Sequence, residues 1–193
     1  MHSTLSAAGE RTPYRRHQLT VDDFRKLGIA GVLKPDARVE LLTGELIDMA
    51  PIGSRHAGIV AQLAALFSDA HPRALVWVQN PLSLPPDSEP QPDLMLLVPR
   101  DDYYKSAAPA ARDVLLLVEV ADTTLAYDRD IKLPVYARHG IVEVWIVDVA
   151  GGRVERYEAP AADGYRASTV LQPGDRAVAR HVPGIDIDIG VLF

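Results

Sequence analysis

The stretch LLLVEVADTTLAYDRDIK, residues 115–132, places a carboxylate inside an otherwise apolar run. Apart from Glu119, residues 114–121 are apolar on both alternating faces, a pattern typical of a central β-strand. An ionised carboxylate removed from water costs free energy unless it is hydrogen-bonded, paired with a cation or bound to a metal. Two interpretations of Glu119 stay open: a strand-end side chain that reaches solvent or an arginine, or a member of a functional site.

A second carboxylate can reach the same place. Asp93 follows Pro92 at the head of the apolar run 93–98, which we predict to be another strand. If the two strands are neighbours, Asp93 and Glu119 converge, and their oxygens form an anionic pocket suited to Mg²⁺ or Mn²⁺. Considered alone, Asp93 is explained equally well as a turn-forming residue.

Lys132 follows the strand of Glu119 on a predicted helix. This helix is capped by Thr123 or Thr124, carries Asp128 and Lys132 on one side, and ends at Gly140. An Asp and a Lys at this spacing usually form a surface ion pair worth about 0.3–0.5 kcal/mol. The alternative is that Lys132 reaches back over the strand end, where its cation orients an attacking water or stabilises charge on a phosphoryl oxygen. Carboxylates with a lysine are the groups used in metal-dependent phosphodiester cleavage.

Glu40 and His56 are the remaining candidates. The segment RVELLTGELIDMA predicts a β-hairpin with its turn at Thr43-Gly44. Glu40 lies either on the exposed face of this hairpin or at the site as a third acid. His56 shares one face of a helix predicted over residues 54–70 with apolar side chains, so it points inward. It is either a hydrogen-bonded core histidine or a residue that orients a ligand or transfers a proton.

The other segments complete a mixed α/β pattern. Thr20 and Asp23 have the spacing of a capping box, which predicts a short helix over residues 21–28. The loop PLSLPPDSEPQP is too rich in proline for a helix or a central strand. Together the elements predict helices packed on a sheet. The predicted extended segments are 74–79, 93–98, 114–121, two strands flanking Gly151-Gly152, and small edge strands within the tail 164–193.

Composition limits the function classes. The 193 residues, 48% of them hydrophobic, suffice for one globular domain, and the apolar runs are far shorter than the roughly 20 residues of a membrane span. The absence of cysteine excludes disulfides, zinc-thiolate sites and thiol nucleophiles. The net charge of −6 argues against a strongly basic nucleic-acid surface. Residues 1–18 lack the apolar segment of a secretory signal, so we expect a flexible leader and a cytoplasmic location.

Four segments in order, RVELLTGELIDM, QPDLMLLV, LLLVEVADTT and DRDIKLPVYARHGIVEVWIVD, resemble the Uma-type family, whose members are assigned as endonucleases. This family belongs to the PD-(D/E)XK, restriction-endonuclease-like superfamily. The resemblance extends from about Leu19 to Phe193. It implies an α/β fold with a restriction-endonuclease-like core: a mixed β-sheet flanked by α-helices, an N-terminal hairpin and a C-terminal β extension. A single domain over residues 19–193 would follow the leader.

The resemblance also implies roles for individual residues. Asp93 and Glu119 would bind a divalent metal, Mg²⁺ or Mn²⁺, and Lys132 would be the catalytic lysine. The standard superfamily pattern puts this lysine two residues after the acid, where this chain has Ala121. Lys132 instead matches a displaced position familiar in this family, in a D-x-x-x-K pattern that begins at Asp128.

Glu40 and His56 fall on the family's recurring acidic and histidine positions, so the resemblance includes them among the catalytic residues. The leading hypothesis is a divalent-metal-dependent endonuclease that hydrolyses phosphodiester bonds of nucleic acid, with DNA as the expected substrate and a homodimer building the binding groove. The alternative is a nuclease-like scaffold that binds metal, nucleic acid or a partner without turnover. A glycosidase with two carboxylates is a weaker hypothesis, because it gives Lys132 no role.

Overall fold

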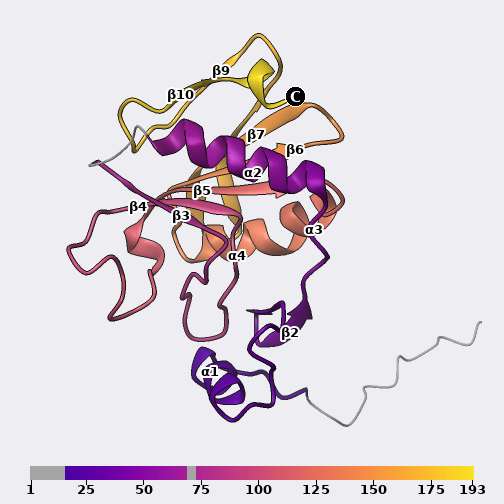
Figure 1. Ribbon diagram of the computed structural model, residues 1–193, viewed down its shortest axis with the longest axis vertical. Coiled ribbons are helices and arrows are strands. Elements are labelled where there is room, and N and C mark those ends of the chain that lie inside the picture. The colour runs from indigo at the N-terminus through magenta and orange to yellow at the C-terminus, as the bar shows by residue number, and fades with distance from the viewer. Residues whose placement is uncertain (1–15, 69–72) are drawn as a thin grey trace, which may run out of the picture.

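A six-stranded mixed β-sheet forms the centre of the molecule (Figure 1). The computed structural model describes residues 16–68 and 73–193, so residues 1–15 of the predicted leader lie outside the described part of the chain. In order across the sheet, the strands are β3 (Leu75–Val78), β4 (Leu94–Leu97), β5 (Val114–Ala121), β6 (Glu143–Asp148), β7 (Arg153–Ala161) and β8 (Gly164–Leu171). Neighbours are antiparallel except β5 and β6, which are parallel.

β5 is the central, buried strand that its sequence predicts. It lies between β4 and β6, and in the ladder with β4 Leu94 is opposite Val118. Because these two strands are antiparallel, the residue just before β4 and the residue near the end of β5 meet at one edge of the sheet. The register therefore brings Asp93 beside Glu119.

Helices cover both faces of the sheet (Figure 1). α2 (Ser54–Phe67) packs over the face that carries Leu116 and Val118, and α4 (Leu133–Arg138) packs over the face that carries Leu117. Both sides of β5 are buried in hydrophobic cores, which explains its almost unbroken apolar sequence. The predicted fold class, a mixed sheet flanked by helices, is confirmed.

The predicted capping box forms at the start of α1 (Val21–Ile29). The Asp23 amide donates to Thr20 Oγ1 at 3.1 Å, and the Thr20 amide donates to the Asp23 carboxylate at 3.1 Å. These two bonds satisfy amides that the first helical turn leaves without partners. α1 and the hairpin that follows it form a small N-terminal lobe, residues 21–48, at one end of the sheet (Figure 1). An ion pair between Arg25 and Glu89 connects this lobe to the loop before β4.

The predicted N-terminal hairpin also lies in this lobe. β1 (Val39–Leu42) and β2 (Glu45–Asp48) are antiparallel, and the two turn residues have positive φ angles of 48° at Thr43 and 80° at Gly44. Such a turn matches the right-handed twist of the strands it joins. Leu41 exchanges two backbone hydrogen bonds with Glu89, so the hairpin is fixed directly beside the loop that leads to Asp93.

The helix predicted after β5 is interrupted. It consists of α3 (Leu125–Tyr127), a π-helical turn η3 (Asp128–Lys132) and then α4. Pro134 lacks an amide and cannot continue the regular ladder of hydrogen bonds, and the Leu133 amide instead donates to the Asp128 carbonyl, five residues back. Thr124 occupies the predicted N-cap position, but its side chain accepts no capping hydrogen bond and its hydroxyl donates to the Asp128 carboxylate instead.

The C-terminal part completes the sheet. β6 and β7 form the predicted hairpin around Gly151-Gly152. The tail was predicted to form only small edge strands. β8 is longer than that: it has eight residues and pairs with β7 at the edge of the main sheet. β9 (Arg176–Val178) and β10 (Asp186–Asp188) form a separate two-stranded sheet, followed by a short 3-10 helix, η4 (Ile189–Leu192). No helix in the described residues has the length and apolar character needed to cross a membrane.

Candidate active site

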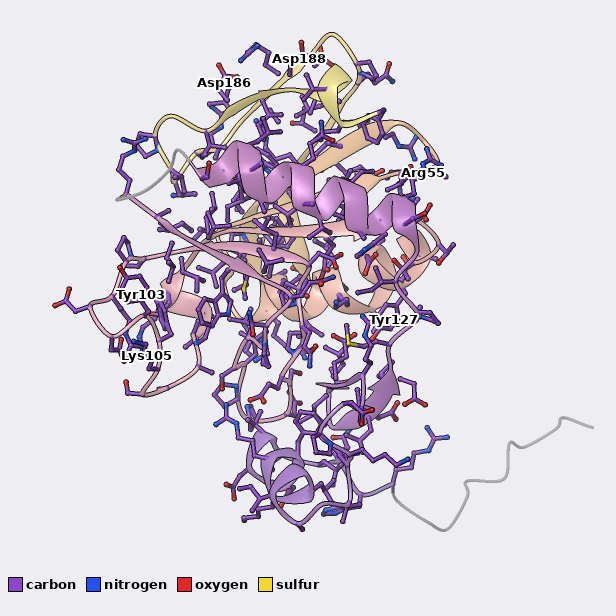
Figure 2. The ribbon with its side chains drawn as sticks, viewed as in Figure 1. Arg55, Tyr103, Lys105, Tyr127, Asp186 and Asp188 are labelled. Atoms are coloured by element: carbon purple, nitrogen blue, oxygen red, sulfur yellow. The ribbon has the colours of Figure 1, made fainter. Side chains whose placement is uncertain are left out.

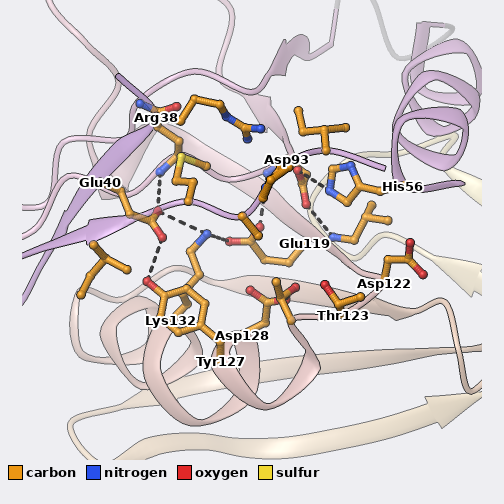
Figure 3. Close-up of a pocket in the computed structure, with 18 of the residues that line it drawn as sticks. Arg38, Glu40, His56, Asp93, Glu119, Asp122, Thr123, Tyr127, Asp128 and Lys132 are labelled. Atoms are coloured by element: carbon orange, nitrogen blue, oxygen red, sulfur yellow. Dashed lines mark hydrogen bonds and ion pairs between the residues drawn. The ribbon is translucent and has the colours of Figure 1, made fainter. Parts of the chain in front are cut away.

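A cavity of about 310 Å³ opens where β4 begins and β5 ends. Its walls come from the N-terminal hairpin, the start of α2, the ends of the two strands and the π-helical turn (Figure 3). All five residues that the sequence analysis singles out as site residues line it: Glu40, His56, Asp93, Glu119 and Lys132. Segments far apart in the chain thus contribute to one site.

Glu119 and Lys132 form a buried ion pair at the bottom of the cavity. Glu119 Oε1 lies 2.8 Å from Lys132 Nζ and accepts a hydrogen bond of 2.5 Å from the Tyr136 hydroxyl. Glu119 and Lys132 are 2% and 4% exposed, and Tyr136 is fully buried. Lys132 therefore reaches back over the strand end, and the alternative of a surface ion pair between Asp128 and Lys132 is wrong.

Glu40 holds the other side of the lysine. Its Oε2 lies 3.4 Å from Lys132 Nζ and accepts a hydrogen bond from the Gln91 amide at 3.0 Å. Its Oε1 accepts a bond of 2.9 Å from the Tyr127 hydroxyl. Tyr127 lies where the N-terminal lobe meets the core (Figure 2). Glu40 is thus a buried anchor for the ammonium group, and the interpretation of an exposed strand residue is wrong.

Asp93 bridges the strand end and α2. Its Oδ1 lies 2.9 Å from His56 Nε2, and its Oδ2 accepts a hydrogen bond of 2.8 Å from the Val120 amide. The Asp93 amide makes a longer contact of 3.3 Å with Glu119 Oε2. These bonds fix the orientation of the Asp93 carboxylate, so the interpretation of Asp93 as only a turn-forming residue does not account for its contacts.

The electrostatics of the site favour an added cation. Burial raises the pKa of Glu119 to about 8, and the charges of Asp128 and Asp93 raise it as well, against the opposing charge of Lys132. Burial by itself lowers the pKa of Lys132, but the charges of Glu119, Glu40 and Asp128 outweigh it and hold this pKa above its ordinary value.

A protonated Glu119 would attract Lys132 less than an ionised one does. Lys132 stays cationic, since Glu40 and Asp128 also raise its pKa, whereas ionisation of the buried Glu119 depends on further positive charge. Burial opposes ionisation of Asp93, but His56 holds its pKa below the ordinary value, and the same contact raises the pKa of His56.

A second polar cluster fixes the π-helical turn from the other side. Arg129, the residue after Asp128, donates two hydrogen bonds to the Glu155 carboxylate on β7, one of them 2.7 Å long from Nε. Tyr157 donates to the same carboxylate at 2.8 Å. A bidentate arginine contact of this kind restricts rotation of the turn. It therefore helps to orient Lys132 toward the cavity.

The donor set fits Mg²⁺ or Mn²⁺. Six carboxylates line the cavity, those of Glu40, Asp48, Asp93, Glu119, Asp122 and Asp128. Lys132 contacts Glu40 and Glu119, and His56 contacts Asp93. Within the described residues no three His, Asp or Glu side chains are grouped as metal ligands. This does not exclude Mg²⁺, because that ion is commonly bound by one or two carboxylates together with water and substrate phosphates.

Sequence reasoning missed the two tyrosines of the site. Tyr136 lies four residues after Lys132, a spacing that places two side chains on one helical face, so the pattern contained a signal for it. Tyr127 gives no comparable signal, because its partner Glu40 is on the distant hairpin. One of the two alternatives paired Asp128 with Lys132 on the surface, but the Asp128 carboxylate accepts a hydrogen bond of 2.7 Å from the Thr124 hydroxyl.

Comparison with known protein families supports the same class of function as the geometry of the site. A family model, Uma2, described as "Putative restriction endonuclease", matches residues 21–190. The chain belongs to the Uma2 family. The resemblance noted in the sequence is thereby confirmed, and membership supports a nuclease function in general terms.

Solved structures give the same fold. Five chains of solved structures match. One is a "putative nuclease belonging to DUF820" from Anabaena variabilis ATCC 29413, with a TM-score of 0.70 and 17% sequence identity over 90% of this chain and 97% of that chain. At this identity the likeness shows the fold alone. A search of curated proteins found no match.

Proposed function

We propose that this Uma2 protein is a divalent-metal-dependent endonuclease that hydrolyses phosphodiester bonds, with DNA as its substrate. The observation that carries the proposal is the meeting of Asp93, Glu119 and Lys132 in one cavity, with Lys132 Nζ 2.8 Å from Glu119 Oε1. Two carboxylates and an ammonium group provide for a divalent cation and for a second positive charge near a phosphate.

Asp93 and Glu119 would hold the metal. A bound Mg²⁺ or Mn²⁺ supplies positive charge that neutralises phosphoryl oxygens and lowers the pKa of a coordinated water. His56 orients Asp93 through its contact with Oδ1, and Tyr136 orients Glu119 through Oε1. Such outer partners keep metal-binding carboxylates in place before substrate arrives.

Lys132 would act on the phosphate. Glu40 and Glu119 hold its ammonium group between them, and it stays cationic. In hydrolysis, the oxygen of water forms a bond to phosphorus, the ester bond to the leaving oxygen breaks, and negative charge grows on the phosphoryl oxygens. A fixed cation stabilises this charge without having to reorganise during the reaction.

The test is cleavage of plasmid DNA with Mg²⁺ or Mn²⁺ by the full chain and by Asp93→Asn, Glu119→Gln and Lys132→Met. We expect the wild-type chain to cleave and each variant to lose at least about 100-fold in rate. Asp163→Asn is the matched control, since that carboxylate is exposed in a turn and pairs with Arg166 outside the cavity. A wild-type chain that leaves plasmid intact with either ion would contradict catalysis and favour the non-catalytic scaffold.

We also propose that two copies of the chain act together on DNA. The basis is the net charge of −6, from 26 acidic and 20 basic residues, which makes a long duplex a poor ligand for one copy unless an assembly concentrates the basic groups. Sedimentation of the full chain with and without a DNA duplex tests this. A sedimenting mass of one chain per duplex would contradict it.

A further inference from the structure

Among the described residues, Arg38 is the basic side chain of the cavity that forms no ion pair with a carboxylate. Three basic residues line the cavity, and the other two, Lys132 and His56, contact its carboxylates. Arg38 is exposed, and within residues 16–68 and 73–193 its guanidinium takes part in no ion pair and no hydrogen bond. A free guanidinium beside a cluster of buried acids is available to an anionic ligand.

The hairpin fixes where Arg38 lies. The Met49 amide donates a hydrogen bond of 2.8 Å to the Arg38 carbonyl, which extends the β1–β2 ladder to this residue. Arg38 and Glu40 are two residues apart, so their side chains leave the same face of the strand. Figure 3 shows Arg38 on the side of the cavity where Glu40 and Asp93 lie. Its charge also reaches His56, where it opposes the rise in pKa that Asp93 causes.

Acidic residues near Arg38 make its positive charge distinctive among the groups that line the cavity. Asp48 and Asp122 also line the cavity, and the chain as a whole is acidic. A polyanion approaching the opening is therefore repelled by most of the surface it meets. A guanidinium offers a planar pair of donors that matches phosphate oxygens, and arginine keeps its charge at any working pH.

We propose that Arg38 binds a backbone phosphate of the substrate next to the one that is cleaved. This inference rests on the proposed function, and it names the contact that would set the register of the strand in the site. Phosphate contacts position a nucleic acid without reading its sequence. Arg38 would therefore contribute to binding and leave the chemistry to the groups at the bottom of the cavity.

The test compares Arg38→Gln and Arg38→Lys with the wild-type chain in two measurements. Cleavage kinetics with Mg²⁺ give KM and kcat, and fluorescence anisotropy with a short labelled DNA duplex, in Ca²⁺, gives affinity at several salt concentrations. Arg112→Gln is the matched control, because its side chain is 85% exposed and does not line the cavity.

We expect Arg38→Gln to raise KM about tenfold with kcat within about twofold of wild type. The slope of log affinity against log salt should fall by about 0.9, the value for one lost phosphate contact. Arg38→Lys should keep the slope and lose part of the affinity, because it retains the charge without the planar donors. Arg112→Gln should change neither.

The outcomes separate this inference from the proposed function. If wild type does not cleave, but Arg38→Gln weakens binding and lowers the slope, the Arg38 contact stands and the nuclease proposal fails. If wild type cleaves and Arg38→Gln matches Arg112→Gln in KM and slope, the Arg38 contact is overturned and the nuclease proposal stands. A wild-type chain that does not bind the duplex overturns the Arg38 contact as well.

Discussion

Lys132, on a π-helical turn after the central strand, places its ammonium nitrogen 2.8 Å from Oε1 of Glu119 on that strand. Both side chains are buried, so each depends on its protein partners for compensation of its charge. The carboxylate that interrupts the apolar strand is thus held by a lysine from the next element of the chain. This pair links the stability of the fold to the chemistry of the site.

Removing the lysine should destabilise the fold as well as the activity. Lys132→Met leaves Glu119 and Glu40 buried without their shared cation, so we expect a loss of about 3 kcal/mol in the free energy of unfolding, measured by urea denaturation. Adding Glu119→Gln to Lys132→Met removes one of the stranded carboxylates and should recover part of this loss. Equal stability of wild type and Lys132→Met would show that the pair contributes little.

The raised pKa of Glu119 predicts how stability depends on pH without metal. The carboxyl has a pKa of about 8 in the folded chain and an ordinary value near 4.5 in the unfolded chain, so between these values the folded state binds more protons. Stability should therefore fall as pH rises from about 4.5 to 8, by at most about 1.4 kcal/mol per pH unit from this group. Urea denaturation in a chelator, compared with Glu119→Gln, isolates this contribution. An unchanged pH dependence in Glu119→Gln would contradict the assignment.

His56 should matter for metal affinity more than for folding. Its contact with Asp93 Oδ1 orients that carboxylate, and loss of such a partner typically weakens metal binding about 10- to 100-fold. We expect His56→Ala to show this loss in calorimetric titration with Mn²⁺, whereas His181→Ala, at an exposed position outside the cavity, should bind Mn²⁺ like wild type. If His56→Ala bound Mn²⁺ with wild-type affinity, His56 would not orient the ligand.

Gly44 should be required for the hairpin that carries Glu40. Its φ is +80°, and a Cβ added there would lie 2.5 Å from Cβ of Gln18. Gly44→Ala should therefore cost at least about 1 kcal/mol in unfolding free energy and lower the cleavage rate. Gly28→Ala is the control, because it lies in α1 with no atom within 4 Å of the added Cβ, and there alanine should stabilise by about 0.5–1 kcal/mol. A neutral Gly44→Ala would exclude the positive-φ turn.

Local patterns were enough to predict most of the fold. The capping box, the Thr43-Gly44 turn and the apolar strand 114–121 each contain their own signal within a few residues, and the structure has all three. The π-helical turn was missed although Pro134 marks it, because helical spacing alone does not distinguish an α-helix from one with a wider turn.

The site was harder to predict because it depends on strand order. Asp93 and Glu119 meet only because β4 and β5 are antiparallel neighbours, which no short pattern specifies. The contact of Glu40 with Tyr127 joins the N-terminal lobe to the helix after β5, and nothing in either segment indicates the other. Long-range pairing of this kind follows from the assembled fold, so sequence reasoning could name Glu40 without assigning its role.

The most direct test of metal binding by Asp93 and Glu119 is anomalous diffraction from crystals of the full chain grown with Mn²⁺. We expect an anomalous peak in contact with both carboxylates, and loss of that peak in Asp93→Asn crystals under the same conditions. Crystals that contain Mn²⁺ only at other places, with these two carboxylates keeping their protein partners and no metal between them, would contradict it.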